Sequence, residues 1–597
     1  MGYRRGRKKS FGRLPTGRGK SRGAGGGKPP SRRHNRRQIL PWEDEILGLL
    51  YQRGDWVEQA DLLAELALPR QGRKEVQQVL TGLCRQKVLA CKGTRYRLQQ
   101  PLEYMEGTIS VHPRGFAFGA VTKAPEGKKP ARDLFIPPEA LGSARHGDRV
   151  LLKLTAREGD RLFGRVVRIL ERARNQLVGT YLAGGRTGLV TPEDERFPFT
   201  IVIPREQSAG AKDGEAVVAE IIEHPPAGHP KGRITEVLGD PHKLSVQTDV
   251  VLRRFELPHQ FGKKALAQAE GLAAEIKVEA GRADLREIEH VTIDGETARD
   301  FDDAVAVEKT RQGYRLYVSI ADVSHYVALG SALDQEAYER GTSVYFPTRV
   351  VPMLPERLSN DLCSLVPRED RLAFTAVLDF DRQGRRRGKA FTKSIIQSQH
   401  RFTYTTVKEL LIDKLPAVRK EHKPFLTPLK WMEELARQLL ARRLERGSIG
   451  FEIPEAAVLI GPEDTVAGIV RTERNFAHQI IEEFMLAANE AVAETFAEQE
   501  FPALYRIHEA PDPTKVAEFA DFAVSMGLEL PADVGSPKWF GKVLKLVEGK
   551  PTEYIVNNLL LRSMKQAAYS PENVGHFGLA APYYTHFTSP IRRYPDL

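Results

Sequence analysis

The sequence contains an internal repeat, residues 102–170 and 176–240, which restricts the fold of that part of the chain more than any other feature. Each copy consists of short segments of alternating apolar and polar residues, separated by glycine and proline. Such segments are typical of strands in small β-barrels. In both copies a glycine follows a proline after 10 residues, and another follows that proline after 27 or 28 residues (Pro137, Gly147 and Gly164; Pro204, Gly214 and Gly232). The sequence therefore predicts two small β-barrels.

The first copy carries two phenylalanines, Phe116 and Phe118, within the stretch HPRGFAFG. Side chains two residues apart point to the same side of a strand. Exposed rings beside arginine form a platform for stacking unpaired bases, so Phe116, Phe118, His112 and Arg114 are predicted to bind single-stranded nucleic acid. The alternative is that both rings belong to the barrel core. The second copy has Leu-Val-Thr at 189–191 instead, which predicts weaker stacking, and the first copy resembles a cold-shock domain, an OB-type barrel.

Residues 41–100 are predicted to form a winged-helix-like domain. Three stretches place apolar residues at i, i+3 and i+4, and a short basic hairpin, CKGTRYRLQQ, follows them. Two interpretations stay open: the wing contacts nucleic acid, or the domain only packs against its neighbours. Before it, residues 1–37 contain 14 Lys or Arg and no Asp or Glu. We interpret residues 1–40 as a disordered basic arm that neutralises phosphates, with a solubilising tail as the alternative.

The remaining composition favours a cytoplasmic protein. Subtracting the 14 charges of the arm from the net charge of +11 leaves −3, so the folded body is slightly acidic. The three cysteines, Cys84, Cys91 and Cys363, form neither a CxxC pair nor a zinc-binding spacing. We expect no disulfide framework, as suits a reducing compartment. Because there is no signal peptide and no apolar run near the roughly 20 residues of a membrane span, we expect no membrane partner, and we expect a monomer.

Residues 246–597 are predicted to form one large α+β domain. YRLYVSIADVSHYV alternates cleanly, and LAFTAVLDFD and KAFTKSIIQSQHRFTY are further predicted strands. Long amphipathic stretches such as ERNFAHQIIEEFMLAANEAVAETFAEQE predict helices. The predicted fold is thus a multidomain α+β protein, with a winged helix, two OB-type barrels at 101–172 and 173–245, and a large domain that carries the candidate site.

The strongest chemical signal is the acidic stretch TIDGETARDFDD at residues 292–303. Two unit charges about 4 Å apart repel by roughly 4 kcal/mol at an effective dielectric near 20, so such a cluster needs water or cations around it. Its apolar flanks place it between buried strands and argue against a solvated acidic loop. Oxygen ligands without Cys or His favour Mg²⁺, with Mn²⁺ possible, and several carboxylates can hold two ions for in-line attack on a phosphodiester. The stretch contains five acidic candidate ligands: Asp294, Glu296, Asp300, Asp302 and Asp303.

Other candidate residues lie far from this stretch. Arg592 and Arg593 follow a proline in HFTSPIRRYP, and an arginine fork can hold a phosphate and stabilise transition-state charge. Because adjacent side chains on a helix point about 100° apart, at most one of the two is expected to reach the metal site. Tyr345 in GTSVYFP and Phe451 in GSIGFEIPE are candidates for stacking on bases, although taken alone either ring could belong to a core.

These segments together resemble the RNB family of exoribonucleases. The matching stretches are TIDGETARDFDDA, SIADVSHYV, TSVYFPTRVVPMLPERLSNDLCSL, IIEEFMLAANE and HFTSPIRRYPDL, in family order between residues 292 and 597. The winged-helix-like segment favours the ribonuclease R branch. The resemblance implies processive hydrolysis of single-stranded RNA, or of RNA with a 3′ overhang, from the 3′ end to 5′-nucleoside monophosphates by two-metal-ion catalysis. It implies a metal set of Asp294, Asp300, Asp302 and Asp303, catalytic roles for Asp302 and Arg592, and a base clamp of Tyr345 and Phe451.

The family continues beyond Leu597, with further catalytic-domain helices and a third OB-type domain, so we expect the catalytic domain to be incomplete. The main alternative function is a non-catalytic RNA-binding regulator built on an inactive nuclease domain. A missing aspartate would support it, but all four are present. A winged-helix DNA-binding regulator leaves the acidic domain unexplained, and the resemblance favours an exonuclease over a metal-dependent endonuclease.

Overall fold

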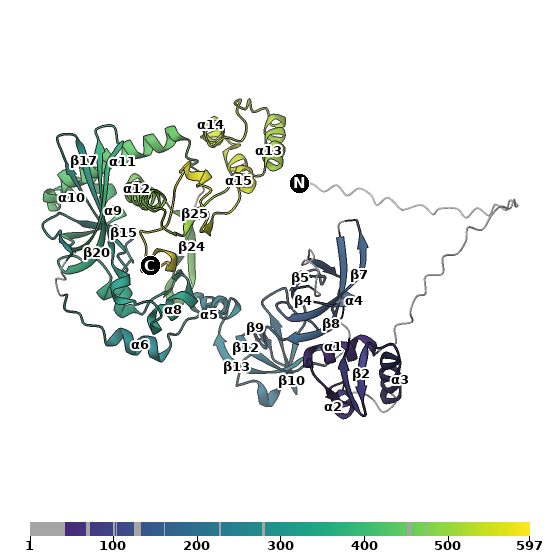
Figure 1. The fold of residues 1–597 in the computed structure, drawn as a ribbon. Helices are drawn as coiled ribbons and strands as arrows, with labels where there is room; N and C mark the ends of the chain where they lie inside the picture. Colours follow the sequence, from purple (N-terminus) through teal and green to yellow (C-terminus); the bar gives the residue numbers. More distant parts are fainter. Residues whose placement is uncertain are drawn as a thin grey trace, which may run out of the picture. The chain divides into compact units, whose positions relative to one another are not determined.

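The computed structural model describes residues 42–66, 72–99, 102, 104–124, 133–159, 161–225, 228–276, 281–450, 455–472 and 474–597. The predicted basic arm and Phe451 lie outside the described residues. The chain divides into two compact units between Ala173 and Arg174, and Figure 1 shows the helices and strands of each. In the part of the chain that the structure describes, no helix is long and apolar enough to cross a membrane.

The first unit begins with three helices and a small sheet, which confirms the predicted winged helix. The sheet has the strand order β1-β3-β2, and β2 and β3 form the wing. The apolar stripes of the helices meet in one core, in which Ile46, Leu62 and Leu80 are fully buried. The elements are α1 (Glu43–Arg53), β1 (Val57–Glu58), α2 (Gln59–Glu65), α3 (Gly72–Arg85), β2 (Leu89–Lys92) and β3 (Arg95–Leu98).

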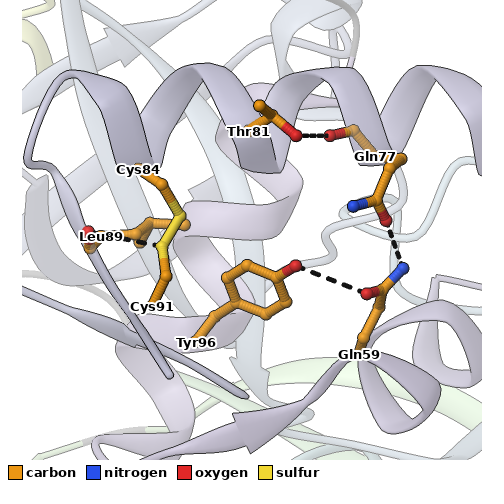
Figure 2. The surroundings of a disulfide bond; sticks show 7 residues. All are labelled: Gln59, Gln77, Thr81, Cys84, Leu89, Cys91 and Tyr96. Carbon is orange, nitrogen blue, oxygen red and sulfur yellow. Dashed lines mark hydrogen bonds between the residues drawn. A yellow bond between two sulfur atoms is a disulfide. The ribbon is translucent and has the colours of Figure 1, made fainter. Parts of the chain in front are cut away.

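One expectation from the cysteines is wrong. Cys84, near the end of α3, and Cys91, on β2, form a disulfide (Figure 2), whereas the cysteine pattern predicts none. The pairing has no motif signature, because it depends on the turn that brings β2 back along α3 and sets the two Cα atoms 6.3 Å apart. That distance is normal for a disulfide. The bond ties the wing to the helix beside it, and Cys363 is free and buried.

Helix α1 packs directly on the first barrel. Its buried Asp44 accepts a hydrogen bond from the hydroxyl of Tyr104 and forms ion pairs with Lys153, at 2.9 Å, and with Arg165. Leu151 of the barrel belongs to the same hydrophobic core as α1. Of the two interpretations of the winged helix, packing against its neighbour is therefore confirmed, and contact with nucleic acid stays a prediction.

Both halves of the repeat fold into closed five-stranded barrels, as predicted, and their strands connect in the same order. The first closes as β4-β5-β6-β8-β7 and the second as β9-β10-β11-β13-β12. The first consists of β4 (Tyr104–Val111), β5 (Ala117–Lys123), β6 (Leu134–Ile136), α4 (Pro138–Leu141), β7 (Arg149–Glu158) and β8 (Arg161–Glu171). The second consists of β9 (Gln176–Leu182), β10 (Thr187–Pro192), β11 (Ile201–Pro204), β12 (Ala216–Glu223) and β13 (Lys231–Gly239).

Glycines have the same structural role in both barrels. Gly147 and Gly214 precede the fourth strand with φ of 87° and 82°, a conformation that residues with a Cβ rarely adopt. Gly107 and Gly179 lie in the first strand, where a Cβ atom would come within 2.5 Å of a carbonyl oxygen of the second strand. These backbone requirements explain why glycine recurs at equivalent points of the repeat.

The second unit continues with a seven-stranded sheet whose two faces are covered by helices, which confirms the predicted α+β class. One face packs on α9 (Tyr404–Leu411), α11 (Leu426–Arg446) and α12 (Phe476–Glu498). The other packs on α6 (Lys263–Glu270), α8 (Ala332–Arg340) and η2 (Arg357–Leu362). In spatial order the strands are β14 (Ala283–Asp284), β21 (Arg386–Gln397), β20 (Asp370–Asp381), β17 (Gly313–Ala321), β16 (Asp303–Lys309), β15 (Val291–Asp294) and β22 (His400–Thr403).

The remaining elements complete the second unit. Helices α13, α14 and α15 enclose a core of their own around Trp539 and Phe540. Short hairpins and single helices make up the rest: α5 (Leu244–Arg254), α7 (Val323–Tyr326), β18 (Val344–Tyr345), β19 (Val350–Val351), α10 (Pro416–Glu421), β23 (Glu455–Ile460), β24 (Val466–Thr472), β25 (Tyr505–Ile507), α13 (Pro513–Ser525), α14 (Pro537–Val547), α15 (Glu553–Ser563) and β26 (Ala568–Ser570).

A buried ion pair joins α11 to α12 and gives a test of the packing. Arg443 Nε lies 3.0 Å from Glu483 Oε1, and the two side chains are 10% and 2% exposed. Arg443→Met leaves a buried carboxylate without its partner, which costs about 3–5 kcal/mol. We expect a clearly lowered melting temperature by circular dichroism. The control is Arg233→Met, which removes an exposed pair with Glu220 and should cost about 0.2–1 kcal/mol. Equal losses in the two variants would contradict the packing role.

Candidate active site

The four candidate aspartates lie where β15 ends and β16 begins. β15 ends at Asp294 and β16 begins at Asp303. The two strands are antiparallel neighbours, with Val291 opposite Val305, so the end of one lies beside the start of the other. The connecting loop carries the other two aspartates. The apolar residues on both sides are buried in the sheet, as the flanking sequence predicts.

All four aspartates line one cavity of about 390 Å³. Its walls come from five parts of the second unit that are distant in sequence, so tertiary folding assembles the site. The structure brings the predicted Tyr345 and Arg592 to the aspartates. The residues that line the cavity include Asp294, Asp300, Asp302, Asp303, Tyr345, Tyr404, Glu482, Met485, Asn489, Tyr584, Arg592 and Arg593.

The loop between the two strands is held from β22, which pairs with β15 in parallel. Arg401 on β22 donates to the carbonyl oxygens of Gly295 and Glu296, at 2.6 and 3.0 Å. Thr405 donates its hydroxyl to the carboxylate of Glu296 at 2.6 Å. Arg401 thus holds the loop backbone next to Asp294, and Thr405 holds the side chain of Glu296, so both support the acidic cluster.

Asp302 connects the cluster to the C-terminal segment. Its Oδ1 accepts a hydrogen bond of 2.7 Å from the backbone N–H of Ile591, and its Oδ2 lies 3.7 Å from Nε of Arg592. Arg592 also donates to Ser589 Oγ at 3.0 Å. The neighbouring Arg593 is turned to Asp596, at 2.7 Å, although it too lines the cavity. Of the adjacent arginines, Arg592 is therefore the one that contacts the cluster.

Tyr345 touches the cluster through its hydroxyl group. The hydroxyl donates to Asp300 Oδ2 at 2.7 Å, while half of the residue stays exposed. Burial, and then this hydrogen bond, raise the pKa of the tyrosine above its usual range, so the hydroxyl remains a donor. The ring is thus fixed at the edge of the cavity with surface left for a ligand.

Burial raises the pKa values of the clustered carboxyl groups. The pKa of Asp294 rises to about 8, first through burial and then through the charge of Asp303. Burial raises the pKa of Asp303 to about 6, and that of Asp302 well above its usual range, although Arg592 opposes both shifts. The carboxylates therefore cannot all be ionised without cost unless a cation joins them, because a bound cation stabilises the ionised form.

The donor types at the site fit a hard divalent cation. The cavity lining within the described residues offers carboxylate oxygens and neither cysteine nor histidine, a set that suits Mg²⁺ or Mn²⁺. Among those residues, no three Asp, Glu, His or Cys side chains already enclose one point as ligands do. One oxygen of Asp300 accepts a hydrogen bond from Tyr345, and one oxygen of Asp302 accepts a hydrogen bond from the N–H of Ile591. The other oxygens of these carboxylates would hold the ion.

Several cavity residues are missed by the sequence reasoning. Glu482, Met485 and Asn489 reach the cavity from one face of α12, at positions i, i+3 and i+7. Tyr404 stacks on His478, with ring centroids 4.0 Å apart. Polar residues at helical spacing inside the apolar stretch IIEEFMLAANE are a local signal for the first group. The tyrosine has no such signal, because its position depends on how α9 follows β22.

In the first unit, the predicted stacking residues form an aromatic face on the barrel. Phe118 is 41% exposed and Phe116 is half-buried, while Ala117 between them fills the core. The alternative that both rings are core is therefore wrong. The ring of His112 stacks on Phe116 with centroids 4.4 Å apart, and Arg114 is exposed nearby. Phe135 on β6 and Phe163 on β8 extend the face and are missed by the sequence reasoning.

Three family models match the sequence. The model for the RNB domain matches residues 282–597, which is more than half of the chain. The model for the Ribonuclease B OB domain matches residues 107–169, and the cold shock domain model matches residues 189–262. The matches cover the large α+β domain and both barrels.

Curated relatives and a solved structure agree with these matches. Ribonuclease R of Aquifex aeolicus is 40% identical over 562 residues, 93% of this chain and 78% of that protein. Ribonuclease R of Escherichia coli is 40% identical over 572 residues, 94% and 69% of the two chains. The structure of Mycoplasma genitalium RNase R in complex with ribose-methylated single-stranded RNA has a TM-score of 0.75 and 27% identity, covering 82% of this chain and 78% of that chain.

The raised carboxyl pKa values predict how Asp294→Asn changes stability. An unfolded aspartate has a pKa near 3.9, below the folded values of about 8 and 6 for Asp294 and Asp303. In the metal-free protein, the contribution of these two groups to stability is therefore fully present below about pH 4 and is lost as the pH rises through 6 toward 8. Asp294→Asn removes one ionising group, so it should raise the melting temperature in EDTA by several degrees at pH 8, and by less at pH 5.

Thermal unfolding at both pH values, with EDTA and then with added Mg²⁺, measures this effect. Mg²⁺ should stabilise the unaltered protein more than the Asp294→Asn variant. Asp521→Asn, at an exposed position on α13, is the matched control and should change neither result. An Asp294→Asn protein that melts lower than the unaltered protein in EDTA at pH 8 would overturn this reading of the cluster.

Proposed function

The chain belongs to the ribonuclease R family, and from this membership we propose that it is an exoribonuclease that hydrolyses RNA processively from the 3′ end. The observation that carries the proposal is the cavity in which four aspartates meet an arginine, Arg592, that contacts Asp302. Carboxylates that hold cations, beside a guanidinium that binds phosphate, suit phosphodiester hydrolysis. The proposed products are 5′-nucleoside monophosphates.

The proposed cofactor is Mg²⁺, with Mn²⁺ as the alternative, held by Asp294, Asp300, Asp302 and Asp303. When bound, two such ions supply Lewis acidity to the scissile phosphate and lower the pKa of the attacking water. The chain's own contribution is to keep the carboxylates together in spite of their repulsion. The supports for this are the contacts of Arg401 with the loop and of Ile591 with Asp302.

Arg592 is the proposed catalytic arginine. Its side chain is 43% exposed, its Nε is 3.7 Å from Asp302 and one terminal nitrogen donates to Ser589, which leaves further N–H groups for a phosphate. A guanidinium presents several donors in a fixed plane and matches the oxygens of a phosphate. We assign it the stabilisation of charge that develops on the scissile phosphate, while Ser589 orients it.

Tyr345 is the proposed seat of the 3′-terminal base. Its ring is half exposed at the edge of the cavity, and its hydroxyl is anchored on Asp300, so a base stacked on the ring would lie next to the cluster. Phe451, which lies outside the described residues, is proposed as the opposing ring on the strength of the family resemblance. Such a clamp would set the terminal phosphodiester at the carboxylates.

The proposed substrate is single-stranded RNA, or RNA with a 3′ overhang. The aromatic face of the first barrel supports this proposal, because its exposed and half-buried rings suit stacking on unpaired bases and not on a closed duplex. The Mycoplasma relative has been solved with single-stranded RNA. A cytoplasmic monomer is the state that the composition favours.

Asp302→Asn tests the proposed chemistry. Asparagine keeps an oxygen for the Ile591 N–H, so we expect a folded protein, but it removes the charge at the centre of the cluster. Hydrolysis of a 5′-labelled RNA with a 3′ overhang in Mg²⁺ should fall at least about 100-fold, the scale of losing a major electrostatic contribution. RNA affinity should stay within a few-fold.

The controls for this experiment are EDTA, which should stop shortening by the unaltered protein, and filter binding of each variant to the same RNA. Stepwise shortening that stops with either the variant or the chelator supports the exonuclease. Tight RNA binding without shortening in any lane would replace it with the alternative of a non-catalytic RNA-binding regulator.

Phe118→Ala tests the role of the aromatic face in RNA binding. Stacking of a base on an aromatic ring contributes about 1–3 kcal/mol, so the Kd for single-stranded RNA should rise roughly 5- to 150-fold. The second barrel provides a matched control, Leu189→Ala, at an exposed position of the equivalent strand. Fluorescence anisotropy with a labelled oligoribonucleotide measures both. Equal affinities for Phe118→Ala and Leu189→Ala would exclude the proposed platform.

A further inference from the structure

A second cationic side chain lies on the wall that carries Tyr584. β25 and β26 are antiparallel, and Arg506 is directly opposite Tyr569. On the other side of β25, the backbone N–H of Arg506 donates to the carbonyl oxygen of Tyr584 at 2.9 Å. Side chains directly opposite each other in a sheet lie on the same face. The chain thus places Arg506 and Tyr569 together, one strand away from the cavity-lining Tyr584.

The guanidinium of Arg506 has no acidic partner. It stacks over the ring of Tyr569 at 4.7 Å, and among the described residues it forms no ion pair and no side-chain hydrogen bond. The carboxylate of Asp596 is not such a partner, because it already pairs with Arg593 and accepts a hydrogen bond from the backbone N–H of Ser589. The charge of Arg506 is therefore held in place by an aromatic ring and remains available to an anion.

His586 provides a second donor at the same place. Its Nδ1 lies 2.7 Å from the hydroxyl of Tyr569, and its ring contacts both Tyr569 and Tyr584, with centroids 5.6 and 5.8 Å apart. Burial, and then the charges of Arg593 and Arg506, lower the pKa of His586 to about 3, so the ring is neutral. When the tyrosine hydroxyl donates to Nδ1, the proton of the ring is on Nε2, which makes Nε2 a hydrogen-bond donor.

We propose that Arg506 and His586 form a second phosphate-binding subsite beside the acidic cluster, which binds the phosphate group of a nucleotide. The inference rests on the proposed function, since it concerns the phosphates of the same substrate or product. The ligand has two sources: a phosphodiester further along the RNA chain, or the released nucleoside monophosphate on its way out. In both cases a guanidinium and an imidazole N–H replace the water around an oxyanion.

The first arm of the test uses the free nucleotide. Binding of adenosine 5′-monophosphate and of adenosine to the full chain in EDTA is measured by titration calorimetry, so that no metal ion contributes. The monophosphate should bind more tightly than the nucleoside. Arg506→Gln should weaken this binding at least tenfold, and Arg506→Lys should retain most of it. Arg442→Gln, at an exposed position on α11, is the matched control and should have no effect.

The second arm uses RNA in which one phosphodiester near the 3′ end is replaced by a neutral methylphosphonate. If the subsite holds a chain phosphate, one replacement raises KM for the unaltered protein and has no further effect in Arg506→Gln. His586→Phe keeps the ring and removes the N–H. His586→Phe should reproduce the effect of Arg506→Gln on nucleotide affinity or on the methylphosphonate response. It replaces Arg506→Gln in the test if that variant does not fold.

A response in the first arm assigns the subsite to the released monophosphate, and a response in the second assigns it to the RNA chain. The inference is overturned if adenosine 5′-monophosphate binds no better than adenosine and every methylphosphonate affects Arg506→Gln as it affects the unaltered protein. Hydrolysis of unmodified RNA by the unaltered protein in Mg²⁺ is measured beside both arms. Failure of that reaction counts against the proposed function, whereas normal hydrolysis without either response counts only against the subsite.

Discussion

Burial of the acidic cluster, together with repulsion among its carboxylates, is the constraint on which the second unit depends. The fold holds carboxyl groups in a partly buried cavity where the pKa of Asp294 rises to about 8. Such an arrangement opposes folding and persists only if contacts with the surrounding structure hold the carboxyl groups in place. Three neutral or cationic partners do so from separate elements: Arg401 on the loop carbonyls, the N–H of Ile591 on Asp302, and the hydroxyl of Tyr345 on Asp300. The unfavourable free energy of burying the cluster is thus offset by contacts from residues far apart in the sequence.

Backbone contacts in the same region position Arg592, the proposed catalytic arginine. The segment before Arg592 is held by its backbone: Asn489 of α12 accepts the N–H of Phe587, and the carbonyl of Arg592 accepts the N–H of Ser343. Asp302 then accepts the N–H of Ile591. Because these bonds fix the main chain, the guanidinium can stay half exposed without losing its place. Because most of these supports act on the backbone, only the contacts with Ser589 and Asp302 engage the donors of the guanidinium itself.

Local pattern and tertiary contact explain which parts could be predicted. The two barrels could be predicted because glycines such as Gly147 and Gly214 are required by the local backbone conformation. The acidic cluster could be predicted because its charges lie within one short stretch of sequence. The Cys84–Cys91 bond, the Arg401 support and the stacked Tyr404 depend on which strand or helix lies beside which. The spacing of residues in the sequence does not show which elements become neighbours in the fold. The face of α12 is an intermediate case, because helical periodicity marks its polar positions but not the cavity they line.

The two barrels separate what the fold requires from what a ligand requires. Both have the same strand order and the same strained glycines. Buried Ala117 of β5 corresponds to buried Gly188 of β10, because each lies opposite an isoleucine of the third strand, Ile136 or Ile203. The neighbours of these residues point outward and are free to differ: Phe116 and Phe118 in one copy, Thr187 and Leu189 in the other. The alignment of residues 189–191 with Phe116–Phe118 that the sequence suggests is therefore wrong by two positions. A repeated fold therefore tolerates divergence on its outer face without loss of its core. Since aromatic rings on that face gain nothing from the barrel core, their presence in one copy alone is better explained by a ligand than by stability.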